Sequence, residues 1–302
     1  MSRLPTLSLL AAAILSLAAC GAPTQLVRGE PATQVAAVGG GENVPANDNL
    51  NAVLWVQKAQ EYRALSIQTW RMAEVTLDRA LADPQWTALL PGEGAELQNP
   101  ALKPAVVVDV DETVLDNSPY QARMVLDGTS YKEESWAEWV AEKRARPVPG
   151  ALAFARAASA RGVTLLYISN RTEQMKADTL ENLRAVGFPV ADDGVYLGMG
   201  VDVPGCTRPH EDKGCRRIKV ADQYRVLMQV GDQITDFTQP PSNTNADRDA
   251  LLAEHGDWIG ERWFMLPNPT YGGYESAALG NRRGLSETQR RAAKRAALEP
   301  AR

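Results

Sequence analysis

Residues 105–113 read Ala-Val-Val-Val-Asp-Val-Asp-Glu-Thr, and this stretch decides the fold. The apolar, β-branched run that precedes Asp109 is typical of a buried strand. In an open parallel sheet, ligands bind at the carboxyl ends of the strands. Asp109 and Asp111 therefore lie where a ligand site is expected. A strand followed by an ordinary acidic turn is the alternative, because Asp is common in turns.

Two carboxylates this close together are costly to keep charged. Like charges ~4 Å apart repel by ~4 kcal/mol at an effective dielectric constant near 20. A divalent cation or a shared proton relieves this repulsion. The pair Asp109 and Asp111 therefore favours a metal site or an acid–base pair.

Two further strand-like segments end in polar side chains. Residues 163–168 run into Ser169-Asn170-Arg171, and residues 226–230 run into Gly231-Asp232-Gln233-Ile234-Thr235-Asp236, with Lys213 in a loop between them. The carboxyl ends of parallel strands lie at one edge of a sheet. We therefore expect residues 109, 111, 169 and 232 to lie at that edge.

Strand and helix patterns alternate along the body of the chain, which predicts a parallel sheet with right-handed crossovers. The predicted strands cover residues 105–108, 163–168, 195–197, 226–230 and 263–266. The predicted helices cover residues 51–83, 150–160, 173–186, 217–224 and 246–255. Residues 116–146 interrupt this alternation.

These motifs carry a family resemblance. Asp-x-Asp-x-Thr, a strand-end Ser, a Lys and Gly-Asp-x-x-x-Asp resemble the haloacid dehalogenase superfamily of phosphotransferases. More closely, the chain resembles the class C (four-aspartate) bacterial acid phosphatases. The resemblance spans roughly residues 51–279 and includes segments 116–120, 136–140, 149–151 and 266–273.

The resemblance implies an α/β fold with a Rossmann-like parallel sheet and a mainly helical cap. Superfamily members place a cap after the first strand. We therefore assign residues 50–302 to one catalytic domain, with a cap formed by an N-terminal helix (50–83) and the insertion 116–146.

The resemblance also implies the roles of the catalytic residues. Asp109 attacks phosphorus and becomes an aspartyl phosphate. Asp111 protonates the leaving oxygen and then activates water. Ser169 donates to a phosphate oxygen, and Lys213 adds positive charge, although Arg216, Arg217 and Lys219 are rival cations.

The implied cofactor is Mg²⁺, bound by Asp109, the backbone carbonyl of Asp111, and Asp232. Asp236 is expected to hold metal-bound waters, with a surface carboxylate as the alternative. Thr113 is expected to orient Asp111 or close the turn, or merely to cap a helix or lie in a loop.

Substrate recognition is assigned to Tyr271, whose ring can stack on a nucleobase, although a packing tyrosine is an equal alternative. Asn170 and Arg171 are expected to shape the pocket. The implied substrates are small phosphomonoesters, with 5′-nucleotides first. A sugar phosphatase or phosphotransferase is one alternative, and a non-catalytic ligand-binding surface lipoprotein is another.

The N-terminus reads as a targeting segment. Residues 1–19 contain Arg3 and a short apolar run, and Leu17-Ala18-Ala19-Cys20 has the form of a lipoprotein cleavage box. We expect lipidation of Cys20, a tether over residues 20–49, and anchoring in the bacterial cell envelope, with the outer membrane favoured because no Asp follows Cys20. A plain secretory signal is the alternative.

Charge and motif counts exclude several function classes. The net charge of −5 disfavours nucleic acid as a partner. Only two histidines occur, with no Arg-His-Gly motif, and no cysteine has an Arg six positions later, which excludes histidine and cysteine phosphatases. A homodimer remains open.

Two cysteines besides Cys20 flank Lys213. An exported chain favours a disulfide between Cys206 and Cys215, which we expect to rigidify the lysine loop; two free thiols are the alternative. Residues 286–298 have the pattern of a basic helix capped by Ser286. A solvated helix or frayed tail is favoured over contact with anionic lipid.

Overall fold

A computed structural model describes residues 46–209 and 211–301. Its central sheet has five parallel strands in the order β5-β4-β1-β6-β7. The strands are β1 (Lys103–Val108), β4 (Thr164–Thr172), β5 (Tyr196–Met199), β6 (Tyr224–Gly231) and β7 (Trp263–Met265). This confirms the predicted parallel α/β fold. The signal segment, Cys20 and almost all of the tether lie outside the described residues.

Strand β1 lies in the middle of the sheet, between β4 and β6. Its residues Ala105 to Val108 are almost fully buried, because helices cover both faces of a parallel sheet. The ladder continues one residue past the strand, where the backbone N–H of Asp109 donates to the carbonyl of Val230 at 2.9 Å. The first acidic residue is therefore fixed to the sheet itself.

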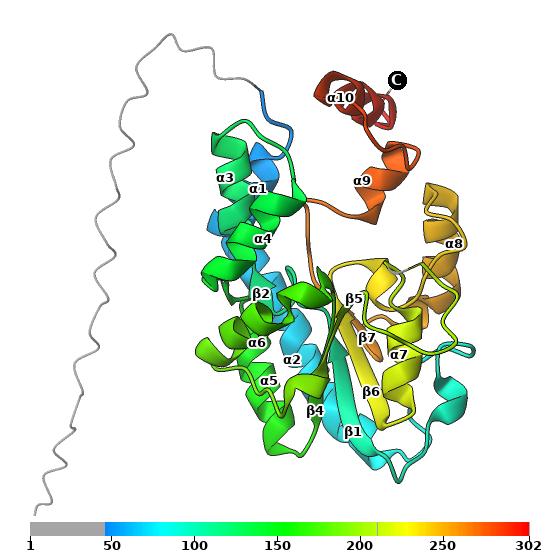
Figure 1. The fold of residues 1–302 in the computed structure, drawn as a ribbon. Coiled ribbons are helices and arrows are strands. Elements are labelled where there is room, and N and C mark those ends of the chain that lie inside the picture. The colour runs from blue at the N-terminus through cyan, green and yellow to red at the C-terminus, as the bar shows by residue number, and fades with distance from the viewer. Residues whose placement is uncertain (1–45, 210, 302) are drawn as a thin grey trace, which may run out of the picture. The chain divides into compact units, whose positions relative to one another are not determined.

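Helices cover the two faces of the sheet (Figure 1). α2 (Gln60–Ala82), α5 (Ala151–Ala160) and α6 (Lys176–Ala185) lie on one side, whereas α7 (Gly214–Ala221) and α8 (Asn245–His255) lie on the other. α7 begins three residues before the helix predicted at 217, so Lys213 becomes its N-cap residue. Short 3₁₀ turns lie at Ala95–Leu97, Glu173–Met175, Asp193–Val195, Ile234–Asp236 (η4) and Gly256–Trp258.

The N-terminal helical segment is broken, whereas a single helix was predicted over 51–83. α1 (Leu50–Lys58) ends before Ala59, which is extended with ψ 129°, and α2 follows directly. α1 packs against α3 (Ser118–Leu126), while α2 packs along α5 and against β6 and β7. The break thus separates a part that contacts the insertion from a part that covers the sheet.

The insertion after β1 forms α3 and α4 (Glu133–Glu142). A two-stranded antiparallel pair closes its base, with β2 (Leu115–Asp116) against β3 (Arg146–Pro147). The predicted cap also included the whole of 50–83. Within that segment, α1 packs against α3 of the insertion, whereas α2 packs against α5, β6 and β7.

The C-terminal helices are joined to the domain by ion pairs. α9 (Gly273–Ala278) carries Glu275, which pairs with Arg290 at 3.0 Å and Lys294 at 2.6 Å on α10 (Glu287–Ala296). Arg291 of α10 pairs with Asp48 at 2.7 Å, and Ser286 caps the helix as predicted. α10 is therefore a docked helix rather than a frayed tail. Among residues 46–209 and 211–301, no helix combines the length and apolar character that crossing a bilayer requires.

Candidate active site

Lys213 lies between two aspartates at the carboxyl edge of the sheet. Its ammonium donates to Asp109, at the end of β1, and to Oδ1 of Asp236 at 2.7 Å, in the turn after β6. All three side chains are buried. The capping position of Lys213 on α7 directs this charge at the end of β1, so the lysine and the two acidic motifs converge as expected.

Three buried carboxylates form a cluster that fits a divalent metal. Asp109, Asp232 and Asp236 each offer an oxygen, and these oxygens lie within 4.8 Å of one another. Hard carboxylate oxygens are the ligands that such cations prefer, and one lysine does not neutralise three buried carboxylates. The cluster includes Asp236 directly, whereas the sequence assigned it to metal-bound waters.

Neighbouring side chains fix the orientation of Asp232. Its Oδ1 accepts from the Thr113 hydroxyl at 3.2 Å, and its Oδ2 accepts from the amides of Gln233 at 2.7 Å and Asn268 at 2.8 Å. Thr113 thus holds Asp232 rather than Asp111. Sequence reasoning missed Gln233 and Asn268, although Asn268 lies within one of the segments that carry the family resemblance.

The spacing of the Gly-Asp-x-x-x-Asp motif has a steric reason. A Cβ atom added at Gly231 would collide with the side chain of Asp236. The backbone N–H of Gln233 also donates to Oδ2 of Asp236 at 2.9 Å, which closes the turn. The glycine therefore makes room for the fourth aspartate.

Burial controls the ionisation of the cluster. Burial, followed by the charge of Asp236, raises the pKa of Asp232 to about 7. Burial raises the pKa of Asp109 well above its ordinary value, although Lys213 acts in the opposite direction. Protonation is the response expected of crowded carboxylates, and a bound cation would replace those protons.

Asp111 points away from this cluster, toward Arg171. Its Oδ1 accepts from Nη2 of Arg171 at 2.8 Å and from the Asn117 amide at 2.8 Å, and its side chain is 16% exposed. The guanidinium of Arg171 is buried and also donates to Thr179 at 3.1 Å. Arg171, which the sequence assigned to the substrate pocket, therefore orients the carboxylate assigned to acid–base chemistry.

Ser169 and Asn170 have different surroundings. The hydroxyl of Ser169 is buried 3.4 Å from Oδ2 of Asp111, beside the site. Asn170 instead donates to the backbone carbonyl of Glu211 at 3.1 Å and accepts from Arg216 at 2.6 Å. Asn170 thus connects the end of β4 to the loop that leads to Lys213.

Tyr271 lies on the loop after β7 and donates its hydroxyl to Glu112. Glu112 is buried, has a left-handed backbone conformation (φ 57°), and accepts a second hydrogen bond from the N–H of Asn117 at 2.9 Å. Burial, followed by the charge of Glu112, raises the pKa of Tyr271, which keeps its hydroxyl protonated as a donor. Sequence reasoning missed Glu112 because Tyr271, which donates to it, is distant in the chain.

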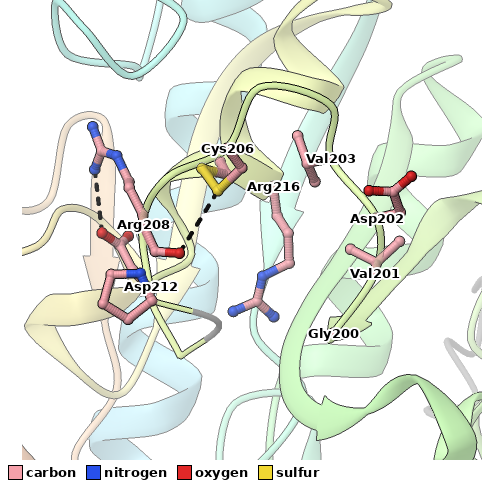
Figure 2. A pocket seen from close by; sticks show the side chains of 10 residues that line it. Gly200, Val201, Asp202, Val203, Cys206, Arg208, Asp212 and Arg216 are labelled. Carbon is pink, nitrogen blue, oxygen red and sulfur yellow. Dashed lines mark hydrogen bonds and ion pairs between the residues drawn. A yellow bond between two sulfur atoms is a disulfide. The ribbon is translucent and has the colours of Figure 1, made fainter.

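The loop that leads to Lys213 is closed by a disulfide. Cys206 and Cys215 are joined with their Cα atoms 5.8 Å apart, so Lys213 lies inside the ring. A cavity of about 200 Å³ lies beside this loop, lined by residues that include Val201, Arg208 and Arg216 (Figure 2). The guanidinium of Arg216 donates to the carbonyl of Ser169 at 2.5 Å, so it helps to hold the end of β4 in place.

The rival cations have other partners. Arg216 bonds the end of β4, and Lys219 donates to the carbonyl of Asp202 at 2.9 Å. Arg217 forms an ion pair with Glu93 at 2.8 Å. Of these four basic residues, Lys213 is the one with an ion pair to Asp109 or Asp236.

These features define an α/β protein with an acidic, lysine-bearing metal site at the carboxyl edge of its sheet, beside a helical insertion. The family model described as HAD superfamily, subfamily IIIB (Acid phosphatase), matches residues 42–274. The chain therefore belongs to the acid phosphatase subfamily IIIB of the HAD superfamily.

Solved structures and curated proteins agree with this assignment. The class C acid phosphatase from Bacillus anthracis is 30% identical, with a TM-score of 0.71 over 84% of this chain and 98% of that one. Its tungstate-bound crystal structure matches with a TM-score of 0.72 over the same shares, also at 30% identity. Acid phosphatase 1 from Solanum lycopersicum is 26% identical over 165 residues, or 55% of this chain. The match covers only 57% of that protein's length.

Proposed function

We propose that this protein is a magnesium-dependent acid phosphatase that hydrolyses small phosphomonoesters through an aspartyl phosphate at Asp109. The observation that carries the proposal is the convergence of Asp109, Lys213, Asp232 and Asp236 at the end of β1 and β6. Membership in the acid phosphatase subfamily supports the same reaction.

The residues that would hold Mg²⁺ are Asp109, Asp232 and Asp236, which offer one oxygen each. The family resemblance adds the backbone carbonyl of Asp111. When bound, the ion would supply positive charge against the phosphoryl oxygens and the carboxylates. Lys213, which forms ion pairs with both Asp109 and Asp236, supplies further positive charge. Ser169 offers a hydroxyl to a phosphate oxygen.

The chemistry divides between two aspartates. A carboxylate oxygen of Asp109 forms a bond to phosphorus while the bond from phosphorus to the ester oxygen breaks, and Asp111 gives that oxygen its proton. Asp111 then accepts a proton from water, whose oxygen attacks phosphorus and releases phosphate and free Asp109. The hydrogen bonds from Arg171 and Asn117 keep Asp111 oriented for both transfers.

The proposed substrates are 5′-nucleotides. Tyr271 supports this, because its loop follows β7 and its hydroxyl is anchored on Glu112, which fixes the aromatic ring beside the site. An anchored ring can stack on a nucleobase. Asn170 bonds Glu211 and Arg216, and we assign it no contact with the base.

A substrate panel with two variants at Tyr271 tests the activity and the substrate class together. Y271A is expected to lower kcat/KM for adenosine 5′-monophosphate by about tenfold or more, mainly through KM, because an aromatic platform for a base is lost. The kcat/KM of Y271A for ribose 5-phosphate, which lacks a base, should differ little from the native value. Y271F keeps the ring, so its kcat/KM for adenosine 5′-monophosphate should fall only a few-fold, about the effect of one hydrogen bond.

Each outcome of the panel has a clear meaning. Failure of the native protein to hydrolyse any phosphomonoester contradicts the phosphatase proposal and favours a ligand-binding protein. Faster hydrolysis of sugar phosphates than of nucleotides favours a sugar phosphatase. Equal losses on both substrates in Y271A contradict the stacking role of the ring.

We also propose that the protein is anchored by lipid at Cys20 in the bacterial cell envelope, with the outer membrane favoured. The cleavage box Leu17-Ala18-Ala19-Cys20 supports this proposal. Cells grown with labelled palmitate should yield labelled protein, and C20S should yield unlabelled protein outside the membrane fraction. Labelled C20S protein would contradict the assignment of this cysteine.

A further inference from the structure

A buried ion pair lies directly behind the catalytic loops. Arg217 lies four residues after Lys213, so both side chains extend from one face of α7. The guanidinium is fully buried and grips Glu93 with two hydrogen bonds, from Nε at 2.9 Å and from Nη2 at 2.8 Å. This is the fork-on-fork geometry of a strong arginine–carboxylate pair.

The remaining guanidinium nitrogen of Arg217 bonds the backbone of the Gly-Asp-x-x-x-Asp motif. Its Nη1 donates to the backbone carbonyls of Asp236 at 3.1 Å and Thr235 at 3.4 Å. Lys213 meanwhile binds the side chain of Asp236 at 2.7 Å. One face of α7 therefore holds Asp236 at both its backbone and its carboxylate.

Glu93 joins three segments that carry or support the site. It comes from the segment before β1 and is 5% exposed. Besides Arg217 it accepts from the Thr238 hydroxyl at 3.3 Å, just after η4, and from Arg208 at 3.3 Å, inside the disulfide loop. Its position therefore depends on α7, on the turn after β6 and on the loop that leads to Lys213.

We propose that Glu93 and Arg217 are positioning residues that set Asp236, and through it the metal cluster and Lys213. In other proteins, apolar residues of similar volume often replace a buried ion pair at little cost, so stability alone does not account for this pair. Apolar residues cannot donate to the carbonyls of Thr235 and Asp236. The function that we assign to the pair is therefore to fix the geometry of the turn after β6.

The test compares two variants with a matched control. The double variant E93L/R217M replaces the pair by apolar side chains, and R217K keeps the charge but cannot bridge Glu93 and both carbonyls. R225M is the control, because Arg225 is also buried and donates to two backbone carbonyls, of Asp83 and Leu81, at the far end of β6. The measurements are Tm, Mg²⁺ binding by calorimetry without substrate, and kcat and KM for para-nitrophenyl phosphate.

We expect E93L/R217M to lower Tm about as much as R225M does, because both leave buried carbonyls without donors. In E93L/R217M but not in R225M, the Kd for Mg²⁺ should rise and kcat should fall, each by about tenfold or more. KM should change less than kcat, because the proposed contact of Tyr271 with the substrate is left intact. R217K should show the same pattern. R225M should lower Tm and leave both Mg²⁺ affinity and kcat unchanged.

Native Mg²⁺ affinity and native kcat in a folded E93L/R217M or R217K protein would overturn the proposal. A second result would also overturn the proposal. If R225M and R217K had equal Tm values and lost Mg²⁺ affinity and kcat to the same extent, those losses would reflect stability alone. If the native enzyme binds no Mg²⁺, the proposed metal is wrong, and the kcat comparison alone then decides the role of the pair.

Discussion

D109N is expected to lower kcat for para-nitrophenyl phosphate by about four orders of magnitude or more, as loss of a covalent nucleophile does elsewhere. An amide cannot form the acyl phosphate, whereas its shape and its hydrogen bond to Lys213 are retained. Because burial raises the pKa of Asp109, loss of the carboxylate should not lower Tm. Acid quenching of the native enzyme with a labelled phosphomonoester should trap label on the protein, and D109N should trap none.

D247N provides the control for this experiment. Asp247 lies in the first turn of α8, accepts from the hydroxyls of Thr244 (the N-cap residue) and Ser242, and belongs to no part of the site. It should keep the native kcat with at most a small loss in Tm. Near-native turnover by D109N, or an absence of trapped label in a fully active native enzyme, would contradict a covalent role for Asp109.

Removal of metal by EDTA is expected to abolish turnover, and excess Mg²⁺ should restore it. Without the ion, three buried carboxylates share one lysine, and some take up protons instead. Because the pKa of Asp232 is about 7, a proton must leave before metal binds at lower pH. The affinity for Mg²⁺ should therefore weaken as pH falls below 7, by up to about tenfold per pH unit, and level off above it.

Calorimetry at pH 5.5 and pH 8 measures this linkage directly, with proton release expected at the lower pH. D232N removes the titrating group and one ligand, so it should bind Mg²⁺ weakly at both pH values and should not recover turnover when the ion is added. Full turnover in EDTA, or an affinity that is independent of pH in the native protein, would contradict the assignment.

The acidic residues at the carboxyl edge of the sheet could be predicted from the sequence, because the signals that place them are local. The valine run before Asp109 and the run before Asp232 each specify a strand and the residue that follows it. Since parallel strands end at one edge, their acidic residues had to meet, and Lys213 joins them as the N-cap residue of α7. The resemblance to acid phosphatases then supplied the family, which the comparisons confirm.

The residues that orient these groups could not be predicted in the same way. Glu93, Glu112 and Asn268 act on partners that lie far away in the chain, and single sequences carry no signal for such contacts. Arg171 was assigned to the substrate, yet its buried guanidinium binds Asp111. The break at Ala59 was missed because neither Pro nor Gly marks it; it arises from packing against two different surfaces.

The antiparallel pair β2–β3 holds the two ends of the insertion side by side. Leu115 faces Pro147 and Asp116 faces Arg146, so the chain leaves the sheet and rejoins it at one place. Inside the insertion, Trp139 donates to Asn117 at 2.8 Å and the ring of Trp136 packs against the guanidinium of Arg171. A change of these two tryptophans would therefore disturb the carboxylate assigned to acid–base chemistry, although neither of them touches it.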